Sequence, residues 1–115
     1  KNKGAYFNNQ RIRVSKKNDI NDCLFATGGI IKNSLDLPFR KSGSAALDLA
    51  YVASGRYDGY FQKKLKLWDI AAGIIILKEA GGLVNEINLS EHKDIKVIAS
   101  SVDISEKLNE KLYNF

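Results

Sequence analysis

Apolar residues recur at strand-like or helix-like spacing in separate segments of the chain. Residues 4–15 contain two extended arms around Asn8 and Asn9, which tolerate the positive φ of a tight turn, and this pattern predicts a β-hairpin. Residues 22–27 form a short apolar run that predicts a buried strand. The stretch from there to Pro38 has no regular period. The first third of the chain is therefore expected to be mostly extended.

Two helices with polar outer faces are predicted from their start signals. Ser44 is a suitable N-cap for a helix over residues 45–54. The apolar side of this helix is expected to carry Leu47, Ala50 and Tyr51. Asp103 and Glu106 have the spacing of a capping box for a last helix. Its apolar stripe consists of Ile104, Leu108 and Leu112. Such a stripe is typical of an outer helix that covers a sheet.

A third helix is expected to begin at Asp69 and to end at residues 81–82, which are both glycine. Residues 70–77 of this segment are apolar or small on every side. A helix without a polar face has to be buried between other layers. Either a partner chain or another part of the polypeptide is therefore expected to cover it.

Extended patterns separate and follow these helices. Residues 57–62, 83–87 and 95–99 each predict a strand, and residues 88–94 predict a loop. Strand and helix patterns alternate along the chain, which favours an α/β architecture with a sheet covered by helices. The 115 residues suffice for one domain, residues 1–115, and no apolar run reaches the length that spans a bilayer.

Composition narrows the function classes. The formal net charge is +5, which is suited to phosphate-bearing partners, either small molecules or nucleic acid. The positive charge is densest at lysines 63, 64 and 66, and such a short lysine run is alternatively a solvated face. Cys23 is the only cysteine, which excludes an internal disulfide and favours a reducing, cytoplasmic setting. The absence of methionine suggests a piece of a longer protein.

Two helix starts are the strongest candidates for chemistry. Residues 43–46 (GSAA) and residues 68–73 (WDIAAG) both combine free backbone N–H groups with small side chains, an arrangement that can bind anions. Asp69 is either a helix cap or a hard oxygen ligand suited to Mg²⁺. His92 lies in a polar loop without a second histidine, and residues 81–82 lack the spacing of a phosphate loop.

The segments 68–73 (WDIAAG) and 79–82 (EAGG) together resemble the second signature of the inositol monophosphatase family of Mg²⁺-dependent phosphatases. Residues 43–56 with 58–59 and the hairpin 4–15 are also similar to family segments. The resemblance covers nearly the whole chain. It implies the C-terminal half of the family's layered αβαβα sugar-phosphatase fold.

The resemblance also implies that the N-terminal half supplies a metal-binding glutamate and an Asp-Pro-Ile-Asp-Gly-Thr signature, neither of which this sequence contains. The family commonly has a longer helical segment where this chain has residues 29–39. A deletion and unrecorded residues are both compatible with that difference.

Matched position by position, Asp69 corresponds to an aspartate that binds the second Mg²⁺ of the family. Gly43, Ser44 and Ala45 correspond to a turn that contacts the substrate's hydroxyl groups. Gln62 stands where the family commonly has a glutamate that accepts hydrogen bonds from the inositol ring. Since glutamine lacks the charge, the resemblance implies a weakened inositol pattern or another sugar-like phosphate.

The expected function is Mg²⁺-dependent hydrolysis of inositol monophosphate or a similar small polyol phosphate by a homodimer, with this segment alone inactive. Within the same superfamily, a bisphosphate nucleotidase or a fructose bisphosphatase is the alternative. From another class, the alternative is a non-catalytic interaction module that binds RNA or a protein partner.

Overall fold

A five-stranded mixed sheet organises the part of the chain that the computed structural model describes, which is residues 4–28, 37–88, 90–113 and 115. Across the sheet the strands are β4 (Phe39–Lys41), β3 (Phe25–Thr27), β5 (Gly59–Leu65), β7 (Ile95–Ser100) and β6 (Leu83–Val84). β4, β3 and β5 are parallel to one another, and β7 is antiparallel to both β5 and β6.

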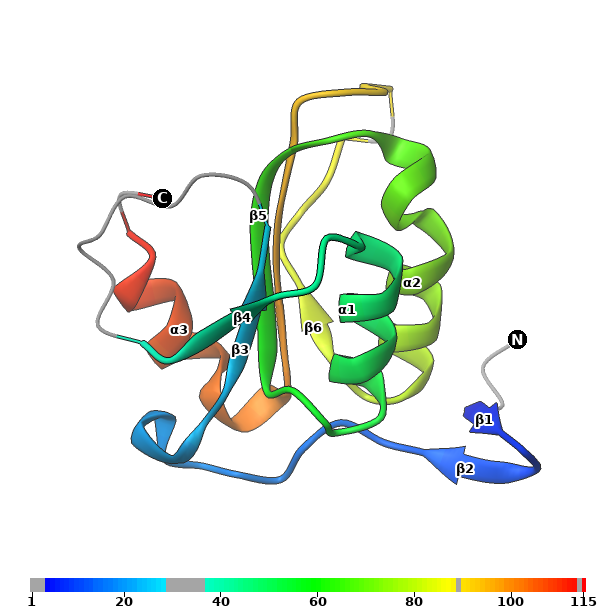
Figure 1. The fold of residues 1–115 in the computed structure, drawn as a ribbon, viewed down its shortest axis with the longest axis vertical. Helices are drawn as coiled ribbons and strands as arrows, with labels where there is room; N and C mark the ends of the chain where they lie inside the picture. Colours follow the sequence, from blue (N-terminus) through cyan, green and yellow to red (C-terminus); the bar gives the residue numbers. More distant parts are fainter. Residues whose placement is uncertain (1–3, 29–36, 89, 114) are drawn as a thin grey trace.

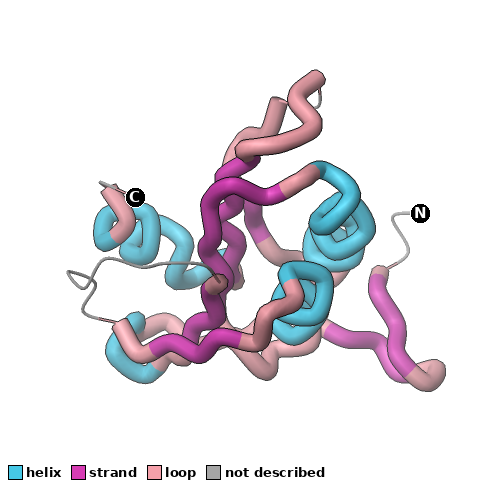
Figure 2. The backbone as a smooth tube through the Cα atoms, turned by 45° about the horizontal axis from the view of Figure 1, so that its top comes forward, coloured by secondary structure: helices cyan, strands magenta, loops and turns pink. Residues whose placement is uncertain are grey.

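Helices cover both faces of this sheet (Figure 1). α1 (Ala45–Ala53) and α2 (Leu67–Glu79) lie side by side on one face, and α3 (Ser105–Lys111) lies on the other. Short 3₁₀ turns, η1 (Ile20–Asp22) and η2 (Val102–Ile104), precede β3 and α3. Figure 2 shows the same order, with the strands between the helices. The expected α/β architecture is therefore confirmed.

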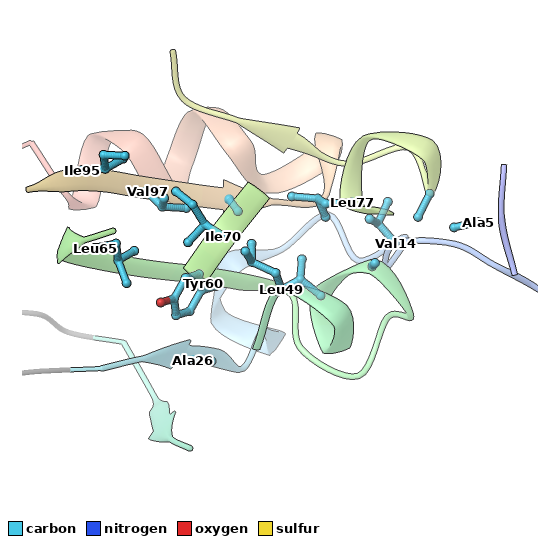
Figure 3. Close-up of a cluster of buried hydrophobic side chains, with 14 residues drawn as sticks. Ala5, Val14, Ala26, Leu49, Tyr60, Leu65, Ile70, Leu77, Ile95 and Val97 are labelled. Carbon is cyan, nitrogen blue, oxygen red and sulfur yellow. The ribbon is translucent and has the colours of Figure 1, made fainter. Parts of the chain in front are cut away.

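The central strand β5 is buried on both faces. Tyr60 packs into the cluster beneath α1 and α2, which Figure 3 shows, and Phe61 packs into the cluster beneath α3. Successive side chains of a strand point to opposite faces, so these two aromatic residues anchor the two layers. Gly59 begins the strand where a Cβ would lie 2.9 Å from the Phe25 ring and 3.0 Å from the Ala99 carbonyl.

The predicted hairpin is confirmed as β1 (Ala5–Phe7) and β2 (Gln10–Ile12), which form a separate two-stranded sheet. Its turn residues Asn8 and Asn9 have φ angles of 51° and 65°. The chain after the hairpin is fixed by a hydrogen bond from Val14 N to Ala80 O, at 3.2 Å. The hairpin thus adjoins the end of α2 and stands apart from the main sheet (Figure 1).

The contact between α1 and α2 depends on a glycine. A Cβ added to Gly73 would lie 2.8 Å from the Cβ of Leu49, closer than real side chains approach. Both residues are buried, and Leu49 is completely so. The absence of a side chain at Gly73 therefore sets how closely the two helices pack.

The start of α1 is held by a short hydrogen-bond network. Ser44 is the N-cap, as predicted, and its Oγ accepts the Leu47 N–H at 3.2 Å. The Ser42 hydroxyl donates to Asp48 Oδ1 at 2.7 Å, and Ser42 Oγ accepts the Ser44 N–H at 3.1 Å. Asp48 is buried, and this burial raises the pKa of its carboxyl, which the hydrogen bond from Ser42 partly opposes.

The strand expected over residues 57–62 is β5, but it begins at Gly59 and continues to Leu65. Three other strand predictions also need correction. The strand expected over residues 22–27 begins only at Phe25, because Asp22 belongs to the 3₁₀ turn η1. β4 was not predicted, because it is a short exposed edge strand with two basic residues. The strand expected over residues 83–87 is shorter, since only Leu83 and Val84 pair with β7. The strand expected at residues 95–99 is confirmed as β7, whereas the segment 29–36 lies outside the described residues.

The helix predictions were right in kind and wrong in three details. α1 buries Asp48, Leu49, Val52 and Ala53, because α1 faces both the sheet and α2. Leu47 is exposed instead of buried. α2 begins at Leu67 and not at Asp69. The side chain of Asp103 does not cap α3, whose N-cap residue is Ile104, although the stripe of α3 is buried as expected.

α2 is not covered all round by the described residues. Ile70, Gly73 and Leu77 face the core, whereas Trp68 and Ile75 are 69% and 63% exposed. The prediction that another polypeptide segment or a partner chain covers this helix stays a prediction. None of the helices within the described ranges has the length and apolar character needed to span a bilayer.

Replacing Gly73 with alanine should lower the free energy of unfolding by about 1–2 kcal/mol. The added methyl group overlaps Leu49 and forces α1 and α2 apart, which outweighs the gain of about 1 kcal/mol in helix propensity. Urea denaturation measures the change. Ala72→Ser adds one heavy atom at an exposed site on the same helix and is the control, with almost no expected change. A more stable Gly73→Ala variant would contradict the tight packing.

Asp48→Asn should change how stability depends on pH. Because burial raises the folded-state pKa of Asp48, the folded protein binds this proton more tightly than the unfolded chain. The carboxyl therefore favours folding relatively more below its ordinary pKa of 3.8 and less as the pH rises through its folded-state pKa. The stability of the asparagine variant relative to the original should increase between pH 3.5 and 7, measured by urea denaturation. A constant difference would show that Asp48 has no raised pKa.

Candidate functional site

The carboxyl ends of three parallel strands meet at one edge of the sheet. β4 and β3 end at Lys41 and Thr27, level with Phe61 of β5, and β5 continues in the same direction to Leu65. α1 follows β4 and α2 follows β5 after short connections, and Figure 1 shows α2 beginning near the top of the view and α1 beginning further down. Ligands of open α/β sheets bind outside the carboxyl ends of parallel strands, where helix amino termini carry partial positive charge. This edge is the candidate site.

Asp69 lies in the first turn of α2, two residues after the helix begins. Its Oδ2 accepts the backbone N–H of Lys66 at 3.3 Å, so the carboxylate caps the helix from inside the first turn. The residue is exposed, and Oδ1 makes no hydrogen bond within the described residues. The neighbouring Trp68 ring is also exposed and has Lys66 Nζ 5.3 Å from its centre. The carboxylate thus remains available to a ligand.

The turn before α1 exposes its backbone. Gly43 has a φ of +85°, and a Cβ placed on it would meet nothing within 4 Å. Glycine is therefore required here by the backbone angle and not by crowding. The Ser44 hydroxyl is engaged in capping, so Ser44 and Ala45 offer mainly backbone to any ligand at this turn.

Gln62 lies on β5 at the same edge, where Phe61 pairs with Thr27 and brings Gly28 alongside. The Tyr60 hydroxyl donates a hydrogen bond to Gln62 Oε1. Burial raises the pKa of Tyr60, and the nearby carboxylates of Asp48 and Asp69 raise it further. Tyr60 is thus within electrostatic range of a carboxylate from the first turn of each helix.

The structure places the predicted site residues Asp69 and the turn at residues 43–45 at the amino ends of α2 and α1, and Gln62 on β5 next to the Tyr60 hydroxyl. It adds three residues that the sequence patterns did not indicate: Ser42, Asp48 and Tyr60. Asp48 gave one usable signal, because it is a lone carboxylate one turn after the cap in an otherwise apolar helix. Tyr60 gave none, since a tyrosine in an apolar strand is ordinarily a core residue.

Asp69 fits a divalent cation as one ligand of a larger set. Its exposed carboxylate supplies the hard oxygen that Mg²⁺ prefers. Across the described ranges, however, no three side chains of the types His, Cys, Asp or Glu are grouped to hold a metal ion. This chain's described residues therefore provide a single carboxylate ligand and not a complete cage.

Two other candidates for chemistry are excluded by their surroundings. Cys23 is buried, and this burial with the charge of Asp58 raises its thiol pKa to about 11, so it is not an activated nucleophile. His92 is exposed in a loop, as expected. An open hollow of about 500 Å³ between residues 18–21 and α3 lies on the other side of the sheet. Neither it nor the two side chains belongs to the candidate site.

Several known proteins are similar to this chain. The "Nus factor SuhB" of Pasteurella multocida is 45% identical, over 74% of this chain and 38% of that protein. The "Fructose-1,6-bisphosphatase/inositol-1-monophosphatase" of Thermotoga maritima is 40% identical, over 76% of this chain and 38% of that protein. Among solved structures, an IMPase of Thermotoga maritima has a TM-score of 0.84 and 34% identity, over 96% of this chain and 48% of that one.

This chain thus spans half or less of the length of these relatives. An inositol monophosphatase from Anabaena has a TM-score of 0.83 and 32% identity, over 97% of this chain and 51% of that one. The family model described as "Inositol monophosphatase family" matches residues 1–114. The chain therefore belongs to the inositol monophosphatase family.

Proposed function

We propose that the protein is a Mg²⁺-dependent phosphomonoesterase that hydrolyses inositol monophosphate or a similar small polyol phosphate. The observation that carries this proposal is the exposed Asp69 carboxylate in the first turn of α2, a helix that packs beside α1 with its own exposed amino-terminal turn. Asp69 is the proposed metal ligand. The proposed substrate contacts are Gly43, Ser44, Ala45 and Gln62. Because the described residues supply one carboxylate ligand, this segment alone should be inactive.

Different residues of this chain bind the cation, the phosphate and the polyol. Asp69 binds a cation at the amino-terminal end of α2. The first turn of α1 directs backbone N–H groups toward an anionic group. The open backbone at Gly43 lets a polyol approach the turn closely. Gln62 offers a hydrogen bond to a substituent away from the phosphate. Mg²⁺, when bound, neutralises phosphate charge and lowers the pKa of coordinated water.

Related substrates are the alternative within this class. The Thermotoga maritima relative carries the names of a fructose bisphosphatase and an inositol monophosphatase together. Comparing turnover of inositol 1-phosphate, fructose 1,6-bisphosphate and a nucleoside bisphosphate would separate these activities. We further propose a cytoplasmic homodimer, on the basis of the family resemblance.

Asp69→Asn in the full-length protein should lower kcat for inositol 1-phosphate by about 10²-fold or more at saturating Mg²⁺. The amide keeps the shape and an acceptor for the Lys66 N–H but removes the charge that holds the cation. Release of inorganic phosphate measures turnover, and circular dichroism checks the fold.

The matched control is Asp103→Asn, which changes the same charge at an exposed residue of η2. This variant should keep full activity. If Asp69→Asn turned over as fast as the original protein, Asp69 would not be a metal ligand and the enzymatic proposal would lose its support.

A second candidate is a non-catalytic module that binds RNA. The similarity to proteins named Nus factor, together with the net charge of +5, supports it. Phosphate contacts by lysine and arginine would then make the affinity fall steeply with salt.

In that case Asp69→Asn should leave RNA affinity unchanged or slightly higher, because it removes one negative charge. Replacing Lys63 and Lys64 together with glutamine should weaken binding several-fold, since two phosphate contacts are lost. Fluorescence anisotropy with a labelled single-stranded RNA at 50 and 200 mM salt measures both effects. RNA binding that is absent at either salt concentration would remove this candidate.

A further inference from the structure

The side chain of Gln62 is held in one orientation by two neighbours. The hydroxyl of Tyr60, a residue with 0% exposure, bonds to Gln62 Oε1. On another side the Gln62 amide lies so close to Gly28 that a Cβ there would overlap it. Gln62 Nε2 is left without a hydrogen bond to any described residue. The amide therefore has a fixed inner oxygen and an available nitrogen.

The direction of the hydrogen bond follows from the burial of Tyr60. Among the described residues, the bond to Gln62 is the only one that the Tyr60 hydroxyl makes. Burial and two carboxylates raise the pKa of this tyrosine, so the hydroxyl keeps its proton. A buried O–H without an acceptor costs free energy, which favours Oε1 over Nε2 as the atom that faces Tyr60.

We infer that Tyr60 is a positioning residue that makes Gln62 present an N–H donor, so that the substrate carries a carboxylate beside Gln62. This inference rests on the proposed phosphatase function. It names the substrate class more narrowly, as a polyol phosphate that also carries a carboxylate.

The charge at position 62 gives this arrangement its selectivity. A glutamate would also accept the Tyr60 hydrogen bond, but its other oxygen would face the ligand, accept from hydroxyl groups and repel an anion. Glutamine with Oε1 turned inward offers two N–H bonds and no negative charge. With Tyr60 and Gln62, the group that faces the ligand is therefore a hydrogen-bond donor suited to an anion. With a glutamate at position 62, it would be an acceptor suited to a hydroxyl group.

Two six-carbon esters test this inference in the full-length protein with Mg²⁺. Gluconate 6-phosphate and glucitol 6-phosphate differ only in having a carboxylate or a hydroxymethyl group at the far end. The original protein should have the higher kcat/KM for gluconate 6-phosphate. Gln62→Glu should lower the gluconate-to-glucitol ratio of kcat/KM about tenfold or more, because it places two negative charges side by side.

Tyr60→Phe should lower the same ratio about threefold, because a Gln62 amide without its partner can turn and present Oε1. Both changes should appear mainly in KM, since the affected group is remote from the phosphate. Gln62→Asn, with a shorter amide, should not reverse the preference. Matched controls are Gln10→Glu and Tyr113→Phe, which make the same chemical changes at exposed sites and should leave the ratio unaltered.

The outcomes separate this inference from the proposed function. Hydrolysis of both esters with the same ratio in Gln62→Glu as in the original protein would overturn the inference and leave the phosphatase intact. A preference of the original protein for glucitol 6-phosphate would also overturn it. Failure to hydrolyse these esters and inositol 1-phosphate would remove the proposed function, and the inference with it. If Tyr60→Phe does not fold, Gln62→Glu decides alone.

Discussion

The burial of β5 on both faces is the constraint on which the rest of the structure depends. The adjacent side chains of Tyr60 and Phe61 pack into two different hydrophobic clusters. The absence of a side chain at Gly59 lets the neighbouring strands pack closely against β5. α1 and α2 together cover the cluster that contains Tyr60. The absence of a side chain at Gly73 lets these two helices pack closely enough to do so. The strand order places β5 between β3 and β7, and the carboxyl end of β5 leads directly into α2. The site is a consequence of how the core is filled.

Strand direction determines which residues meet at that edge. Because β4, β3 and β5 run parallel, residues far apart in sequence, such as Ser44 and Gln62, are brought to the same end of the sheet. The buried Asp48 accepts a hydrogen bond from Ser42 in the turn before α1. The buried Tyr60 donates a hydrogen bond to the amide of Gln62. Two buried polar groups thus fix the geometry of residues that are themselves exposed or half-exposed, as supporting contacts do in binding sites.

Sequence patterns predicted the parts of this fold that local physics decides. The hairpin at Asn8 and Asn9 and the cap at Ser44 depend on nearby atoms, and both are confirmed. The buried side of α1 depends on where the sheet and α2 lie, so Leu47 was placed on the wrong face. The contact of Tyr60 with Gln62 is local in sequence, but the orientation of the amide also depends on Gly28, which follows β3 and is far from Gln62 in sequence. Such a contact has no signature in a single sequence.

α2 combines an exposed apolar area, which surfaces of globular proteins usually avoid, with an adjacent exposed carboxylate. Trp68 and Ile75 leave a large apolar area in water, and Asp69 places beside it a carboxylate whose only hydrogen bond within the described residues is long. Departures from local rules are expected where function imposes its own demands. Trp68 and Asp69 are adjacent in the first turn of one helix, so whatever covers the tryptophan also lies next to the carboxylate. Any surface that packs against the tryptophan must therefore also accommodate the charge of Asp69.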